Sequence, residues 1–162
     1  MKLKFYKRVL VTLLLLVSLS GCRHCREWIY QDVYTFDARY RSGRLVLEPD
    51  SEATPFTLEI VRTRSGVRMY VNALLLPVPA YEGNSELAEL EIILDDGQVL
   101  RVYPYRFAGG ERLLLPSDVG SYLMELLIHE QCFTIYMKHK KARIIPDSFK
   151  KAYFQLMEIP IA

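Results

Sequence analysis

The sequence has few of the residues and motifs from which catalytic and metal sites are usually recognised. Its 162 residues include only three cysteines, three histidines and one tryptophan. It contains no nucleophile elbow, no phosphate-binding glycine loop and no paired metal-binding histidine motif. Gly109-Gly110 lacks the third glycine and the lysine of a phosphate loop, so it predicts a turn. These absences favour a binding or assembly protein without cofactor or metal over an enzyme.

The apolar run near the N-terminus is too short for a permanent transmembrane helix. Residues 9–19 form this run of 11 residues, interrupted only by Thr12 and Ser18. As a helix it reaches about 16 Å, roughly half of a bilayer core. It follows a positively charged head made of Lys2, Lys4, Lys7 and Arg8. A basic head that stays in the cytoplasm and a short apolar run are typical of a secretory signal peptide.

The run ends in Leu19-Ser20-Gly21-Cys22, an aliphatic residue, two small residues and a cysteine. Together with the basic head, this tetrapeptide resembles the signal peptide of bacterial lipoproteins, and the resemblance covers residues 1–22 only. It implies cleavage after Gly21 and acylation of Cys22, which becomes the first residue of the mature chain. Two or three acyl chains hold a protein on a membrane far more firmly than one. An ordinary secretory signal or an uncleaved anchor is the alternative.

The same resemblance implies a location in the bacterial cell envelope, with the domain facing the periplasm. Arg23 follows the modified cysteine. In enteric-type bacteria an aspartate at that position is the usual signal for retention in the inner membrane. The expected location is therefore the outer membrane rather than the inner membrane.

The charge of the mature chain does not indicate a nucleic-acid partner. The full chain has 21 Lys and Arg against 19 Asp and Glu, but four of the basic residues precede Cys22. Residues 22–162 therefore carry 17 basic and 19 acidic residues, a net charge of −2. Their 141 residues suit one domain that can bury its own core. The predicted organisation is a signal peptide at 1–21, a lipidated tether at 22–30 and a domain at 31–162.

Two cysteines, Cys25 and Cys132, remain once Cys22 carries lipid. In an oxidising compartment outside the cytoplasm, the simplest prediction is a disulfide between them. Two unpaired thiols are the alternative. Cys132 also lies close in sequence to His129 and Glu130, but these three residues supply at most three ligands and do not predict a metal site.

Alternating apolar and polar side chains predict that most of the domain forms β-strands. The alternation runs through residues 27–41, 44–48, 55–64, 67–73, 89–94, 99–107 and 133–138, with turns at Ser42-Gly43, Ser65-Gly66 and 95–98. Pro104 predicts a bend or an edge in the strand at 99–107. Two units, at 112–124 and 143–157, each combine a short strand with a short helix. The expected fold is mainly β: an antiparallel β-sandwich or partly closed barrel with two short helices. A two-layer α+β fold is the alternative.

The charged residues suggest two candidate surfaces. The basic run contains Lys138, Lys140, Lys141 and Arg143. It suits contact with anionic lipid headgroups, glycan polymers or an acidic partner, and a solvated hairpin tip is the alternative. An acidic set comprises Glu82, Glu86, Glu89, Glu91, Asp95 and Asp96. The two sets form either oppositely charged docking faces or ion pairs within the monomer.

Aromatic and acidic residues of the central strands offer one further site. Tyr103 and Tyr105 share a strand face and form either a recognition surface or half-buried sheet residues. Glu89 and Glu91 lie about 7 Å apart on one strand face, where a glycan hydrolase would need its acid and base. Solvent-exposed strand residues without a catalytic role are the better interpretation of Glu89 and Glu91.

The expected function is a periplasm-facing module in an envelope protein complex, and the alternative is a hydrolase acting on cell-wall or lipid material.

Overall fold

The computed structural model describes residues 27–33, 42–49 and 54–158. These residues form ten strands and two helices. The strands are β1 (Trp28–Val33), β2 (Ser42–Leu47), β3 (Phe56–Thr63), β4 (Gly66–Ala73), β5 (Leu90–Leu94), β6 (Val99–Val102), β7 (Tyr105–Arg106), β8 (Arg112–Leu114), β9 (Phe133–Met137) and β10 (Lys140–Ile144). The helices are α2 (Ser117–Ile128) and α3 (Phe149–Glu158).

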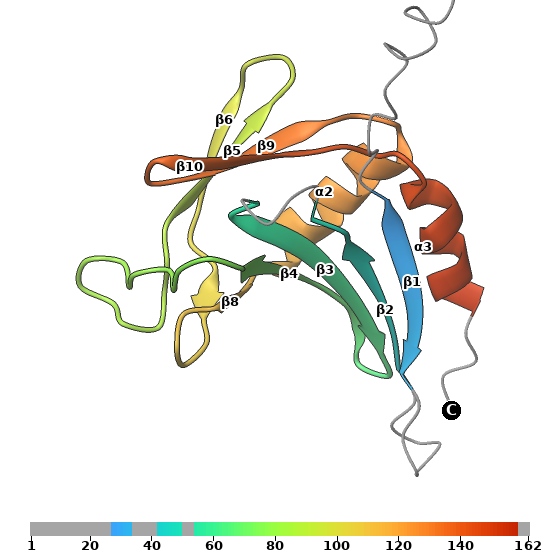
Figure 1. Cartoon of the computed structure of the whole chain (residues 1–162), viewed down its shortest axis with the longest axis horizontal. Helices are drawn as coiled ribbons and strands as arrows, with labels where there is room; N and C mark the ends of the chain where they lie inside the picture. Colours follow the sequence, from blue (N-terminus) through green and yellow to red (C-terminus); the bar gives the residue numbers. More distant parts are fainter. Residues whose placement is uncertain (1–26, 34–41, 50–53, 159–162) are drawn as a thin grey trace, which may run out of the picture.

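The strands make two sheets in which all neighbours are antiparallel. The larger sheet has the order β1-β2-β3-β4-β8-β7, and the smaller has the order β10-β9-β5-β6. In Figure 1 the long β9–β10 hairpin runs across the strands of the larger sheet. The fold is therefore a mainly β sandwich with two helices, as predicted, and the described strands do not close into a barrel.

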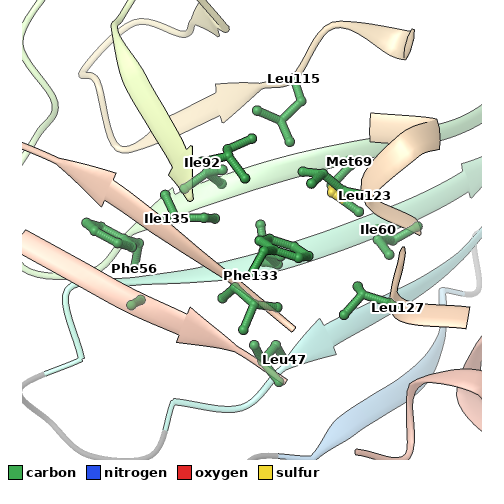
Figure 2. Close-up of a cluster of buried hydrophobic side chains, with 14 of the residues drawn as sticks. Leu47, Phe56, Ile60, Met69, Ile92, Leu115, Leu123, Leu127, Phe133 and Ile135 are labelled. Carbon is green, nitrogen blue, oxygen red and sulfur yellow. The ribbon is translucent and has the colours of Figure 1, made fainter. Parts of the chain in front are cut away.

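The core forms where the apolar faces of the two sheets meet the helices. Leu58 and Ile60 of β3 are fully buried, as are Ile92 of β5 and Phe133 of β9. Figure 2 shows Phe133 in the middle of this cluster, with Ile135 and Ile92 of the smaller sheet on one side and Leu123 and Leu127 of α2 on the other. The period-two burial of β5 and β9 explains this geometry, because alternate side chains of a strand face the same side.

Helix α3 covers the β1 edge of the larger sheet (Figure 1). The Trp28 ring meets the Phe149 ring edge to face at 4.9 Å, and the Trp28 amide donates to the Ser148 hydroxyl at 2.9 Å. The Arg62 guanidinium donates to the Leu156 carbonyl at 2.8 Å, which satisfies an acceptor at the end of α3. Trp28 is therefore part of the domain, and the predicted tether at 22–30 extends too far along the chain.

Two further boundaries differ from the prediction. Ser42 and Gly43 do not form a turn, because they pair with Val33 and Asp32 inside the β1–β2 ladder. The predicted strand at 27–41 is described only as far as Val33, and its remainder lies outside the described residues. The strand at 99–107 divides into β6 and β7, which belong to different sheets. The bend predicted at Pro104 is thus confirmed.

The signal-like segment, Cys22 and Cys25 lie outside the described residues. Cys132 is a half-buried free thiol, and the described residues contain no disulfide. The pairing of Cys25 with Cys132 therefore stays a prediction. In the described part of the chain, neither helix has the length and apolar character needed to cross a membrane.

Gly110 occupies a position that a larger residue cannot fill. Its φ is +71°, and an added Cβ would lie 2.6 Å from the Val78 carbonyl oxygen and 2.6 Å from Nη2 of Arg106. The site is tight because the Val78 amide donates to the Gly110 carbonyl at 2.7 Å, while Arg106 donates to the Val78 carbonyl at 2.7 Å. Gly110 thus lets the segment after β4 dock against the β7–β8 connection.

We expect Gly110→Ala to lower the free energy of unfolding by about 1–3 kcal/mol, because it adds a steric overlap to the cost of a positive φ. Urea denaturation followed by fluorescence of Trp28, the single tryptophan, measures the change. Gly109→Ala is the matched control, since Gly109 has a φ of +86° but no atom within 4 Å of an added Cβ. If Gly110→Ala and Gly109→Ala lowered the free energy of unfolding by the same amount, steric overlap at Gly110 would be contradicted as the cause.

Candidate functional site

A hollow of about 690 Å³ lies between the smaller sheet and the loop that joins β4 to β5. Both its tyrosines and its charged residues come from segments that are far apart in the sequence. We call this hollow the tyrosine groove, and its polar lining comprises Tyr81, Glu82, Glu89, Glu91, Arg101, Tyr103, Tyr136 and Lys138. It combines broad aromatic surface with fixed charges, a composition that suits recognition of another molecule.

Sheet register places three of these side chains in one row. Glu91 of β5 pairs with Arg101 of β6 on one side and with Tyr136 of β9 on the other. Directly opposed residues of antiparallel strands point to the same face. Since Leu90 and Ile92 point into the core, this row lies on the outer face of the smaller sheet.

Tyr81 and Tyr103 form the aromatic wall of the groove. Their rings meet edge to face, with centroids 4.9 Å apart. The Tyr81 amide donates to the Leu87 carbonyl at 2.8 Å, which fixes the loop that carries the ring. The neighbouring Tyr103 phenol is the main cause that raises the pKa of Tyr81, followed by burial and by nearby carboxylates such as Glu89. Tyr81 therefore stays a neutral hydroxyl across the physiological range.

Arg101 binds both carboxylates that sequence analysis considered as an acid and base pair. Its Nε lies 3.3 Å from Oε1 of Glu89, and its Nη2 lies 3.5 Å from Oε1 of Glu91. Glu89, and then Glu91, raise the pKa of Arg101. The cluster offers a ligand fixed charges and hydrogen-bonding groups, and Arg101 contacts only one oxygen of each carboxylate.

The predicted basic run separates into two parts. Lys138 and His139 form the turn of the β9–β10 hairpin, next to Lys140. Arg143 instead donates to the two carboxylate oxygens of Asp95 at 3.0 and 3.3 Å. Its pKa is raised first by the hydrogen bond with the thiol of Cys132 and then by Asp95.

Ion pairs within the monomer therefore join part of the predicted basic and acidic sets. Arg143 pairs with Asp95, and Arg101 pairs with Glu89 and Glu91. Among the described residues, no carboxylate lies within ion-pair distance of Lys138, Lys140 or Lys141. These three lysines remain available for contact with a partner.

Tyr103 and Tyr105 together line a hollow beside the start of α2, but only Tyr103 also reaches the tyrosine groove. Tyr105 packs edge to face on Phe107 at 5.2 Å. Tyr136 was not predicted as a site residue, although it occupies the polar face of a predicted strand. Tyr81 was also missed, because it follows a proline-containing loop that gives no signal for where its ring lies.

The described residues line other hollows besides the groove, among them one of about 810 Å³ beside the start of α3 that is lined by Cys132, Lys150 and Lys151. The hollow beside the start of α2 is smaller, at about 460 Å³, has a mainly apolar lining, and shares Tyr103 with the groove. Within the described ranges, no three His, Cys, Asp or Glu residues gather in a way that could hold a metal ion. Comparisons of the chain with protein families, curated proteins and solved structures give no match.

Proposed function

We propose that this chain is a lipid-anchored protein of the bacterial cell envelope, whose domain binds a protein partner in the periplasm. The anchor is supported by the lipoprotein-like segment at residues 1–22. The binding role is carried by one observation, the gathering of Tyr81, Tyr103 and Tyr136 around the Arg101 cluster. The proposed place of assembly is the periplasmic side of the outer membrane.

The composition of the tyrosine groove favours a protein as the partner. Tyrosine combines a large apolar ring with a hydroxyl, and it is enriched at the centres of protein interfaces. The paired charges of Glu89, Glu91 and Arg101 would orient a partner through complementary polar groups. The groove thus supplies both contact area and orientation.

Photo-crosslinking in the intact host tests this proposal. A photoreactive phenylalanine analogue replaces Tyr81 in the full chain, and the matched control carries the analogue at Tyr122 on α2. The two tyrosines are 38% and 39% exposed, but only Tyr81 lines the groove. We expect a discrete protein adduct at position 81 that disappears when Arg101→Ala is added.

Two results would contradict the proposal. Adducts at position 122 but none at position 81 would exclude the groove as the docking site. Release of soluble fragments from isolated cell wall, abolished by Glu89→Gln or Glu91→Gln, would favour the hydrolase alternative instead.

A further inference from the structure

Three consecutive leucines are exposed directly after β4. Leu74, Leu75 and Leu76 are 45%, 46% and 65% exposed. Single exposed leucines are normal on protein surfaces, but a contiguous apolar group often marks a contact site. These leucines were not predicted as a site, since an apolar run in a sequence usually indicates burial.

Hydrogen bonds at both ends hold the leucines in this exposed arrangement. The Leu74 amide donates to the Pro55 carbonyl at 2.9 Å, and the Val78 amide donates to the Gly110 carbonyl at 2.7 Å. Val78 itself is buried. The segment between Leu74 and Val78 is therefore fixed to the domain, and the exposure of its leucines does not come from a loose loop.

Leu76, the last of the three leucines, lies next to the lysines of the β9–β10 turn. A hollow of about 240 Å³ has Leu76 and Pro77 on one side and Lys138, His139 and Lys140 on the other. We call Leu74, Leu75, Leu76, Lys138 and Lys140 the leucine–lysine surface. Lys141 pairs with Tyr136 and faces the other side of the β9–β10 hairpin. In Figure 1 the turn of the β9–β10 hairpin lies on the opposite side of the molecule from α3.

Lys138 has a backbone conformation that would suit glycine better. Its φ is +54°, in the left-handed region that residues with a Cβ rarely adopt. Glycine or asparagine is the usual choice at such a hairpin position. A lysine there places its charge at the tip of the turn at a cost in conformational energy, which is consistent with a role in binding.

We propose that the leucine–lysine surface binds an anionic lipid bilayer, with the leucines entering the headgroup region and the lysines facing lipid phosphates. Adjacent apolar and cationic side chains are the combination that binds proteins to the surface of charged membranes. The inference goes beyond the proposed function, and Lys138 is the residue that the leucine–lysine surface shares with the tyrosine groove. An anchor at Cys22 would hold the domain near a membrane without determining which face touches it.

A tryptophan reporter at Leu75 tests this contact. The natural tryptophan, Trp28, is buried, so Leu75→Trp adds a distinct exposed fluorophore to the full chain. The purified chain is mixed with vesicles of phosphatidylcholine and phosphatidylglycerol whose acyl chains carry bromine, a quencher of indole emission. We expect at least about a twofold loss of the added emission, and little loss in vesicles of phosphatidylcholine alone.

Phe154→Trp is the matched control, because Phe154 is 54% exposed but lies on α3. Lys138→Gly separates lipid contact from folding: it should reduce quenching of the Leu75→Trp reporter while leaving the urea midpoint unchanged or higher. Equal quenching of the Leu75 and Phe154 reporters would overturn the proposal. A concentration-dependent blue shift of the Leu75 reporter without vesicles would also overturn it, because a second copy of the chain would then cover the surface.

Discussion

Cys22→Ala is expected to remove the protein from the outer-membrane fraction. If Cys22 carries the acyl chains, its loss prevents acylation and the cleavage that follows acylation. The variant should then be soluble or remain in the inner membrane as an uncleaved precursor. Density-gradient fractionation of the host membranes, followed by immunodetection, distinguishes these locations.

Cys25→Ala is the control for this experiment, because it removes a cysteine only three residues away. It should leave the protein in the outer-membrane fraction, although it would abolish the predicted disulfide with Cys132. Retention of Cys22→Ala in the outer membrane at the wild-type level would contradict the lipid anchor. Comparison of Cys22→Ala with Cys25→Ala thus tests whether a cysteine is acylated and whether that cysteine is Cys22.

Phe133→Ala is expected to lower the free energy of unfolding by about 3–5 kcal/mol, the range typical of buried Phe→Ala substitutions. Phe133 is fully buried, and it pairs with Leu94 of β5 and Ile144 of β10. Figure 2 places its ring among core side chains of both sheets and near Leu127 of α2. Removing the ring would leave a cavity where these layers meet, since packed interiors relax only partly.

Urea denaturation followed by Trp28 fluorescence measures this loss as well. Phe154→Ala is the control, because it removes the same side chain from an exposed position of α3 and should change stability by about 0.5 kcal/mol or less. A Phe133→Ala midpoint equal to that of Phe154→Ala would contradict the assignment of Phe133 to the core.

The strands that alternate clearly were predictable from sequence. In β5, Leu90, Ile92 and Leu94 are buried while Glu91 faces outward, as the period-two pattern indicates. The return of the chain at Gly97, which has a φ of +86°, follows from glycine's tolerance of that conformation. These features depend on neighbouring residues, so local sequence is sufficient to predict them.

Features that depend on distant segments were not predictable. Gly43 looks like a turn residue, yet it lies inside a ladder with β1 and β3. Trp28 looks like part of a tether, yet Ile145 and Ser148 bind it from more than a hundred residues away. Tyr81 and Tyr103 meet only because the β4–β5 loop folds beside the smaller sheet.

The intact mass of the native protein, purified from the host membrane, tests the central claim most directly. The lipid-anchor account predicts a chain that begins at Cys22 and carries the additional mass of two or three acyl chains. A chain that retains residues 1–21, or one without added acyl mass, would contradict the account.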